Sequence, residues 1–406
     1  MIQEADMYDF YFHLNTKFYY GKGVVAQIAD EILNYGNKAF FIYDEIPAKA
    51  SGAHDLIHKV CGEKGIAVTD FAITDPHPKH TTIDEARALL KQNGADVVVA
   101  LGGGVTVDSA KAICLTITHD GSCWDVFEAA EKIESLSTQG KKEEGVLPLI
   151  TIPTIAASGS EVSNVAVIEN HEKQLKLDYR SDALRPVAVF TDPTYTYTVP
   201  KFPTACGILD IMSHSYEGYF SHSTGSMQDG ISETIQRTCV EHGRKVMLVP
   251  NAYESRAQLL WAAQLSIAHL SDQGRKFVGN IHATERVVST YFGFPHGAGV
   301  AIMSLAWFKY ALNDQTAYRF ARWAKNVWGV NPALDDMTAA REGLKRYEAF
   351  VEELGVPTRL SQSRLEVSKE LVAKCADEVW ERVDASTWFK PLSSKQELLD
   401  YMMLAW

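Results

Sequence analysis

The first half of the chain alternates short β-rich runs with helical stretches, and the second half has no β-rich run. This contrast constrains the fold more than any other feature. Residues 81–94 show helical apolar spacing that ends at Gly94. Because strands that alternate with helices form parallel sheets, the first half predicts a doubly wound, Rossmann-like α/β domain. The β-rich runs are residues 38–43, 66–72, 95–101, 148–152 and 186–191.

The second half predicts an all-helical domain. Its pattern is helical from about residue 205 to Trp406, with breaks near Pro250, Pro295, Pro332 and Pro357. A chain of 406 residues, 46% of them hydrophobic, is too long for one ordinary core. We therefore expect two domains, an α/β domain of residues 1–195 and an all-α domain of residues 196–406.

Composition excludes several classes of protein. No apolar run reaches the roughly 18 residues of a membrane helix, and the acidic start MIQEADMYDF does not resemble a secretory signal. The net charge is −12 without any basic run, which disfavours nucleic acid and anionic membranes as partners. Six cysteines without a C-x-x-C pair indicate reduced thiols. We expect a cytoplasmic enzyme or binding protein with a small-molecule partner.

A glycine-rich turn lies in VVVALGGGVTVDSAKAI, residues 97–113. The backbone amides of Gly102, Gly103 and Gly104 could approach a pyrophosphate at the start of the following helix. A tight strand-to-helix turn without a ligand would have the same sequence, but the flanking strand and helix favour the phosphate interpretation. The common G-x-G-x-x-G spacing is absent.

Two further segments offer cofactor contacts. The turn TIPTIAASGSEVSN, residues 151–164, carries hydroxyl groups at Thr154, Ser158 and Ser160, although an ordinary loop would look the same. Asp44 ends the run 38–43, where a carboxylate could bind an adenosine ribose. Taken alone, Asp44 is more simply a solvated loop residue.

Four residues in the second half suggest a metal site. Asp210 and His214 are four residues apart on one helix face, a pairing that is usually incidental. His282 and His296 change this assessment, since the break at GFPHG would let His296 turn back toward the helix of His282. One carboxylate with three imidazoles is a ligand set for Zn²⁺ or Fe²⁺.

Several motifs together resemble the iron-containing (group III) alcohol dehydrogenases. They are GGGVTVDSAK, PTIAASGSE, DIMSH and the H-x13-HG spacing of His282 and His296. The phrases DPTYTYTVP and QDGISETIQRTC are most similar to the branch of butanol dehydrogenases and aldehyde reductases, and the resemblance runs from residue 18 to about 356. It implies the dehydroquinate synthase-like architecture, with a nucleotide-binding first domain and a metal-binding helical second domain.

The resemblance implies an NAD(P)-linked alcohol dehydrogenase or aldehyde reductase. In such an enzyme a divalent metal, Fe²⁺ or Zn²⁺, polarises the carbonyl group, the nicotinamide supplies hydride and solvent supplies the proton. We expect the protein to form a homo-oligomer, specifically a dimer. The implied metal ligands are Asp210, His214, His282 and His296. The implied cofactor contacts are Asp44, Gly102, Gly103, Gly104, Asp108, Thr154, Ser158 and Lys176.

The chain departs from the family pattern at two positions. Val105 stands where members usually have serine, which removes one hydroxyl contact to phosphate. Arg286 stands where many members have a histidine near the nicotinamide, and a guanidinium cannot relay protons. Asp44 matches the acidic residue of NAD-preferring members, whereas the NADPH-using aldehyde reductases tend to have glycine, so we expect NADH over NADPH.

Arg286 suggests an acidic substrate. It follows His282 by one helical turn, and a cation beside a metal needs a compensating anion. A semialdehyde, sulfoacetaldehyde or phosphonoacetaldehyde would supply one, and Arg180 would assist. The alternative is a surface arginine on a helix that has diverged.

Two other functions stay open at this point. A dehydroquinate synthase-like lyase would share the fold, but its metal shell typically includes a glutamate and its metal helices carry several basic residues. A non-catalytic cofactor-binding protein could have lost the relay histidine, but it would have little reason to keep all four metal ligands.

Overall fold

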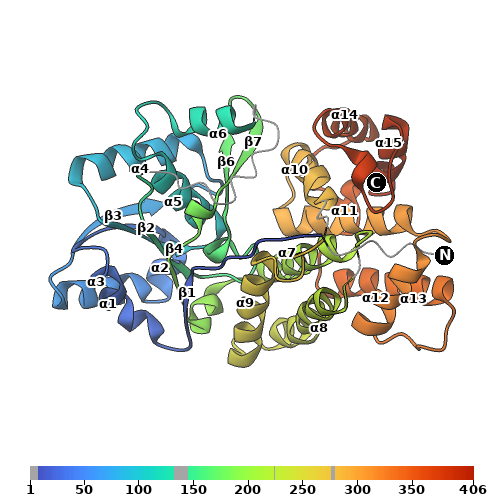
Figure 1. Ribbon diagram of the computed structural model, residues 1–406, viewed down its shortest axis with the longest axis horizontal. Coiled ribbons are helices and arrows are strands. Elements are labelled where there is room, and N and C mark those ends of the chain that lie inside the picture. The colour runs from blue at the N-terminus through green and yellow to red at the C-terminus, as the bar shows by residue number, and fades with distance from the viewer. Residues whose placement is uncertain (1–7, 132–144, 224, 276–278) are drawn as a thin grey trace. The chain divides into compact units, whose positions relative to one another are not determined.

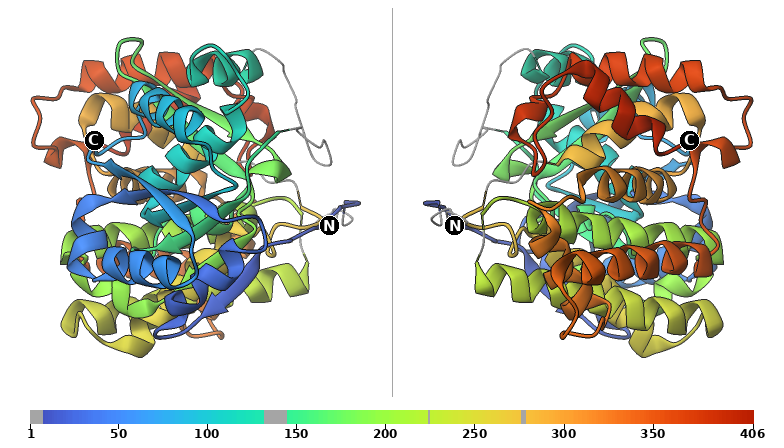
Figure 2. Two further views of the ribbon diagram at one scale, coloured as in Figure 1. Left: turned by 90° about the vertical axis from the view of Figure 1, so that its left-hand side faces the viewer. Right: turned by 90° about the vertical axis from the view of Figure 1, so that its right-hand side faces the viewer.

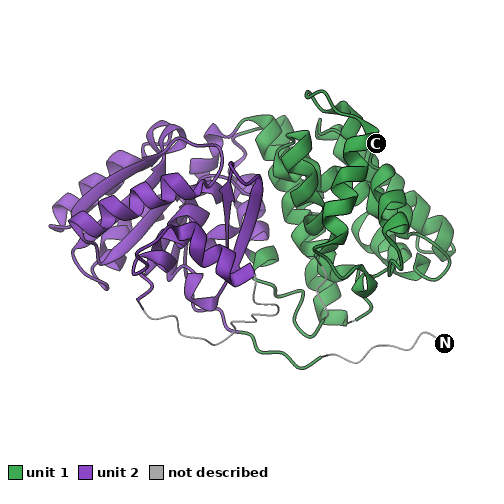
Figure 3. Ribbon diagram, turned by 90° about the horizontal axis from the view of Figure 1, so that it is seen from above, with its two compact units in different colours: residues 1–12, 200–250, 265–406 green, residues 13–199, 251–264 purple. Residues whose placement is uncertain are grey.

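The computed structural model describes residues 8–131, 145–223, 225–275 and 279–406. Most of the acidic start that argues against a secretory signal lies outside these residues. No helix within them combines the length and apolarity needed to cross a membrane. The chain forms two compact units (Figure 3). We call them the sheet unit, residues 13–199 and 251–264, and the helical unit, residues 1–12, 200–250 and 265–406.

The sheet unit contains a six-stranded parallel sheet in the order β1-β8-β5-β4-β2-β3. β4 lies inside the sheet and all its residues are buried, which explains its unbroken apolar run. The doubly wound parallel sheet predicted from the sequence is confirmed. The strands are β1 Lys17–Tyr20, β2 Lys38–Asp44, β3 Ala67–Ile73, β4 Val97–Gly102, β5 Leu149–Pro153 and β8 Ala188–Thr191.

Helices cover both faces of this sheet (Figure 1, Figure 2). Residues of α4, α5 and α6 bury one face, and residues of α1 and α3 bury the other. α3, α4 and α6 each bury one apolar stripe, whereas α5 is buried on nearly every side. The helices are α1 Ile28–Ile32, α2 Glu45–Ala50, α3 Ala53–Glu63, α4 His80–Asn93, α5 Gly104–Thr116 and α6 Cys123–Glu131.

Besides β1, the sheet unit contains two features that the sequence analysis missed. β6 (Val165–Asn170) and β7 (Leu175–Arg180) form a separate antiparallel hairpin. Part of α9 (Tyr253–Ile267) joins the sheet unit, because the Tyr20 hydroxyl donates to the carbonyl oxygen of Ala257 and Trp261 meets Tyr20 edge-on at 5.8 Å. The compact units thus follow spatial contacts and not the single boundary near residue 195 that we expected.

The helical unit contains no strand among its described residues. Its helices α7 and α11 are buried along nearly their whole lengths; α11 is apolar on nearly every side, whereas α7 also buries polar residues. The prolines at the expected breaks lie between successive helices. The helices are α7 Lys201–Tyr219, α8 Ser226–Leu248, α10 Asn280–Phe292, α11 His296–Ala311, α12 Ala317–Val327, α13 Asp336–Glu353, α14 Lys369–Trp380 and α15 Lys395–Met403.

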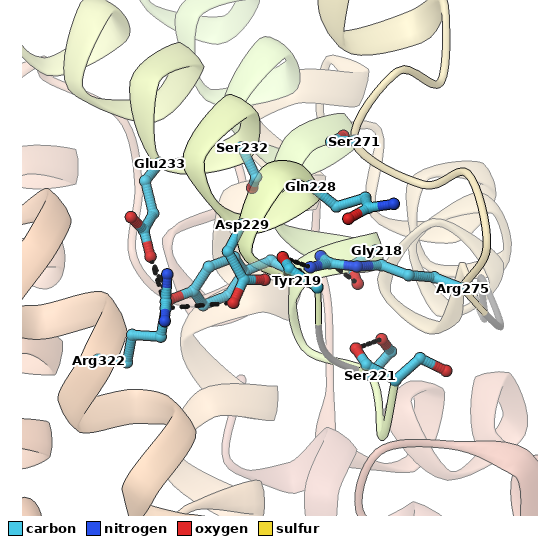
Figure 4. A network of polar contacts seen from close by, with 12 residues as sticks. Gly218, Tyr219, Ser221, Gln228, Asp229, Ser232, Glu233, Ser271, Arg275 and Arg322 are labelled. Carbon is cyan, nitrogen blue, oxygen red and sulfur yellow. Dashed lines mark hydrogen bonds and ion pairs between the residues drawn. The ribbon is translucent and has the colours of Figure 1, made fainter. Parts of the chain in front are cut away.

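A buried ion network links α8 to α12 in the helical unit (Figure 4). Asp229 accepts from Arg319 in a paired arrangement and also from Arg275, while Arg322 bridges Asp229 and Glu233 at 3.2 and 2.9 Å. Burial alone would raise the pKa of Asp229, but the arginines more than offset it and lower that pKa. The network holds α12 against α8.

Candidate metal centre and nucleotide-binding edge

Three helices of the helical unit carry the four expected metal ligands. α7 presents Asp210 and His214 one turn apart, α10 carries His282 in its first turn, and α11 begins at His296. Gly293 ends α10 with a left-handed φ of 64°, which lets the chain turn sharply between α10 and α11.

The four side chains converge on one carboxylate oxygen. Oδ1 of Asp210 lies 3.5 Å from Nε2 of His296, 3.7 Å from Nε2 of His282 and 3.8 Å from Nδ1 of His214. The rings of His214 and His282 stack with their centroids 4.7 Å apart. Ligands around a tetrahedral ion with bonds of about 2.1 Å are separated by about 3.4 Å, so a divalent ion fits here after a small contraction.

Three of the polar atoms that face one another lack hydrogen-bond partners within the described residues. These atoms are Oδ1 of Asp210, Nδ1 of His214 and Nε2 of His282, and all three are buried. Each such atom costs about 1–3 kcal/mol unless a partner satisfies it. Burial lowers the pKa of His214 to about 4, which keeps its imidazole neutral and able to ligate. The donor set therefore fits a metal ion.

Two buried glutamates orient two of the histidines. Oε2 of Glu217 lies 2.6 Å from Nδ1 of His282, and Oε2 of Glu285 lies 2.6 Å from Nδ1 of His296. Burial alone would lower the pKa of His282, but Glu217 and Asp210 raise it to about 10, so a metal binds Nε2 by displacing its proton while Glu217 keeps the proton on Nδ1. Gly299 makes room for Glu285, since a Cβ there would lie 2.7 Å from Oε1 of that glutamate.

The sequence analysis missed this role of Glu217 and Glu285. Each glutamate follows a histidine of the site by three residues, yet each contacts a histidine on another helix: Glu217 on α7 contacts His282 on α10, and Glu285 on α10 contacts His296 on α11. The repeated H-x-x-E spacing was the available signal, but spacing within a helix does not reveal a partner on another helix.

Arg286 lies on α10 one turn after His282 and is half-buried. Its neighbour Glu285 is buried and directed at His296, so Glu285 belongs to the candidate metal centre. The hydroxyl groups of Ser289 and Thr290 donate to the carbonyl oxygen of Arg286.

The sheet unit brings several of the expected cofactor residues together at the edge formed by the carboxyl ends of its strands. Asp44 ends β2, Gly102 ends β4, and Thr154 follows β5, and these are neighbouring parallel strands. With β1 set aside, the order β3-β2-β4-β5-β8 places the topological switch point between β2 and β4, where nucleotides bind in this class of sheet. Burial raises the pKa of Asp44.

The two small-residue turns touch each other at this edge. The amide of Thr154 donates to the carbonyl oxygen of Gly102 over 3.1 Å, and a Cβ on Gly104 would lie 3.1 Å from Oγ of Ser158. A Cβ on Gly102 would collide with Oγ1 of Thr106 at 2.5 Å. α5 starts at Gly104, so its N-terminal amides face the same edge.

Asp108 and the buried Lys111 tie α5 to the second turn. Asp108 accepts from the Ser160 hydroxyl and, over 3.2 Å, from the amide of Val167. Lys111 donates to Ser160 and Ser163 over 3.0 and 2.8 Å, and burial lowers its pKa to about 8. Lys111 was not among the expected site residues.

Lys176 and Arg180 both lie on β7, in the hairpin. Lys176 stands opposite Glu169 and Arg180 stands opposite Val165 in the strand register. Positions four apart on a strand face the same side, so the two cations share one face of the hairpin. Arg180 belongs to the sheet unit, whereas Arg286 belongs to the helical unit.

Comparison with known proteins agrees with both halves of the structure. Residues 15–193 match the model of the iron-containing alcohol dehydrogenases, and residues 204–400 match that of the Fe-containing alcohol dehydrogenase family, C-terminal. The chain belongs to the iron-containing alcohol dehydrogenase family. It is an oxidoreductase that interconverts alcohols and aldehydes, and the family supports a divalent metal and a nicotinamide cofactor. The match leaves the lyase and the non-catalytic protein without support.

The chain is similar to relatives with two different named activities. It is 37% identical to NADH-dependent butanol dehydrogenase A of Clostridium acetobutylicum, over 91% of this chain and 93% of that one. It is 28% identical to the NADPH-dependent aldehyde reductase YqhD of Escherichia coli, over 89% and 91%. The crystal structure of NADH-dependent butanol dehydrogenase A from Thermotoga maritima matches with a TM-score of 0.89 and 28% identity, over 98% of this chain and 99% of that one.

Proposed function

We propose that this alcohol dehydrogenase reduces a short aldehyde that bears an acidic group, with NADH as the hydride donor. The observation that carries the acidic substrate is the position of Arg286, a half-buried cation one helical turn after His282 on α10. Candidate substrates are a semialdehyde, sulfoacetaldehyde and phosphonoacetaldehyde.

We further propose that Asp210, His214, His282 and His296 hold the metal. When bound, the metal supplies a Lewis acid for the carbonyl oxygen and the nicotinamide supplies hydride. Asp210 contributes the carboxylate of the ligand set, and Glu217 keeps the Nδ1 proton of His282 in place. Fe²⁺ and Zn²⁺ both suit this ligand set, and the intrinsic affinities favour Zn²⁺.

In this proposal Arg286 does not move a proton. Its guanidinium stays charged at any ordinary pH and binds a substrate carboxylate, sulfonate or phosphonate through paired hydrogen bonds. The proton that completes the alcohol comes from solvent. The aldehyde, NADH and one proton give the alcohol and NAD⁺, so no further reactant is needed.

A comparison of substrates tests the role of Arg286. In Arg286→Ala, we expect the ratio of kcat/KM for succinate semialdehyde to kcat/KM for butanal to fall roughly 10- to 150-fold, which corresponds to about 1.5–3 kcal/mol. Arg286→Lys should retain part of the preference because it keeps the charge but loses the paired geometry. Arg341→Ala on α13, an exposed position, is the control and should leave the ratio unchanged. A parent enzyme that prefers butanal, with the same ratio in Arg286→Ala, would refute the proposal.

The preference for NADH rests on Asp44. Its place at the end of β2, beside the glycine turn, suits a hydrogen bond to the adenosine ribose. A carboxylate there repels a 2′-phosphate by about 1–4 kcal/mol. We expect kcat/KM to be higher with NADH than with NADPH, and Asp44→Gly to narrow the difference. Equal values for both cofactors in the parent enzyme would contradict this.

We also propose that the protein is cytoplasmic and dimeric. All six cysteines are free and buried, as expected for a reducing compartment. Light scattering coupled to size exclusion tests the dimer, and a monomer at micromolar concentration would rule it out.

A further inference from the structure

We propose that His54, His58 and Asp70 form a second transition-metal site, for Zn²⁺ or Cu²⁺, on the surface of the sheet unit. One potential ligand atom from each of these three residues lies within 4.8 Å of the other two. Within the described residues, the only other such group of three or more is at the metal centre of the helical unit. The proposed site is independent of the function proposed above.

The backbone holds the three residues in fixed positions. His54 and His58 are four residues apart on α3, so their side chains share one helix face. Asp70 lies in the middle of β3, opposite Phe41 of β2 in the strand register. α3 is anchored by buried residues such as Ile57 that belong to the core on that face of the sheet. A metal would therefore bind a largely preorganised site.

Contacts among the side chains bring their ligand atoms together. The rings of His54 and His58 have centroids 4.6 Å apart, and Nε2 of His58 lies 3.0 Å from Oδ1 of Asp70. Aromatic rings on β2 pack against the imidazole of His54: its ring centroid lies 5.8 Å from that of Phe41 and 4.9 Å from that of Tyr43. The imidazoles are thus backed by the core and held close to the carboxylate.

Exposure distinguishes this site from the metal centre. The side chains of His54, His58 and Asp70 are 19%, 35% and 39% exposed, so an ion from solvent can reach them directly. Nδ1 of His54 lies 3.1 Å from the carboxylate of Asp55, which is itself 93% exposed. Because that contact engages Nδ1, we expect the other ring nitrogen of His54 to ligate the ion.

The ligand types decide which ions bind. Two imidazoles and one carboxylate suit Zn²⁺ and Cu²⁺, and the general order of affinities places Cu²⁺ above Zn²⁺. Mg²⁺ and Ca²⁺ prefer shells made of oxygen and would compete poorly. Three protein ligands leave at least one position for water. The bound ion would cross-link α3 to β3, which is an edge strand of the sheet.

The experiment counts Zn²⁺ bound to the full-length protein by equilibrium dialysis with elemental analysis. We expect the His54→Ala/His58→Ala variant to bind one equivalent less than the parent, with unchanged NADH turnover in the absence of added Zn²⁺. His119→Ala is the matched control, because His119 is a surface histidine beside one carboxylate, Asp125 at 3.8 Å, and removing it should not change the count.

Thermal unfolding gives a second readout. Added Zn²⁺ should raise the unfolding midpoint of the parent and of His119→Ala, whereas Asp70→Asn should lose most of that shift. Asp70→Asn also guards against misfolding of the double variant, since it is a conservative change at a half-exposed position. If the parent and the double variant bind the same number of Zn²⁺ ions, or if His119→Ala loses as much, the site does not exist.

Discussion

Replacement of Glu217 by glutamine should weaken metal binding without removing any ligand. Oε2 of Glu217 lies 2.6 Å from Nδ1 of His282, while Oε1 accepts from the amides of Ile281 and His282 over 2.7 and 3.0 Å. One carboxylate thus caps the start of α10 and orients a metal-facing imidazole. A glutamine retains the cap if its oxygen takes the place of Oε1.

The amide nitrogen of that glutamine then faces Nδ1 of His282 as a donor. Two donors cannot bond, so the imidazole must move its proton to Nε2, the atom 3.7 Å from Oδ1 of Asp210. A protonated Nε2 cannot ligate a metal. Loss of such an orienting partner typically costs 10- to 100-fold in metal affinity, or about 1.4–2.8 kcal/mol.

Competition against a chromophoric chelator measures this change on metal-stripped protein. Glu233→Gln is the matched control: Glu233 is also a buried carboxylate of the helical unit, but it accepts from Tyr219, Arg322 and Asn326 and from no histidine. We expect its Kd for the metal to equal that of the parent. An unchanged Kd in folded Glu217→Gln, or an equal loss in Glu233→Gln, would refute the reasoning.

Three further predictions concern stability. Burial raises the pKa of Glu161 from 4.5 to about 7, so its contribution to stability is full below pH 4.5 and is lost as the pH rises through 7. In urea unfolding, the difference in unfolding free energy between Glu161→Gln and the parent should shift in favour of the variant by up to about 3 kcal/mol between pH 4 and pH 8. A difference that does not change with pH would contradict this. Gly297→Ala would place a Cβ 2.1 Å from the carbonyl oxygen of Cys206 and push α11 away from α7. Calorimetry should therefore show about 1–3 kcal/mol of destabilisation, and dialysis should show a weaker affinity for metal. Values equal to those of the parent would be inconsistent with that contact. Asp229→Asn leaves buried guanidinium groups uncompensated, and we expect urea unfolding to show a loss of about 3–5 kcal/mol, where a loss below 1 kcal/mol would argue against the network.

The sequence predicted the elements whose signal is local. The five expected strands are present because each is a run of β-branched and aromatic residues between turn residues. β1 was missed because it is only four residues long and pairs with β8, about 170 residues away. The place of α9 in the sheet unit was also missed, since it depends on contacts such as that of Trp261 with Tyr20.

The same limit applies to the candidate sites. The sequence motifs singled out Asp210, His214, His282 and His296, and the structure brings these side chains together. The motifs did not indicate that the glutamates on α7 and α10 each orient a histidine on another helix, because that pairing depends on helix packing. The juxtaposition of α3 with the edge strand β3, which carries the proposed second site, was hidden for the same reason.

Metal content and NADH-dependent turnover, measured on the same sample of His282→Ala, test the central claim most directly. The measurement uses protein in which His54 and His58 are also replaced by alanine, so that only the metal centre is counted. The four-ligand centre predicts about one equivalent of metal with turnover when His282 is present. With His282→Ala it predicts a loss of most metal and most turnover in a chain that stays folded by circular dichroism. Full metal stoichiometry and full turnover in the His282→Ala protein would contradict the account.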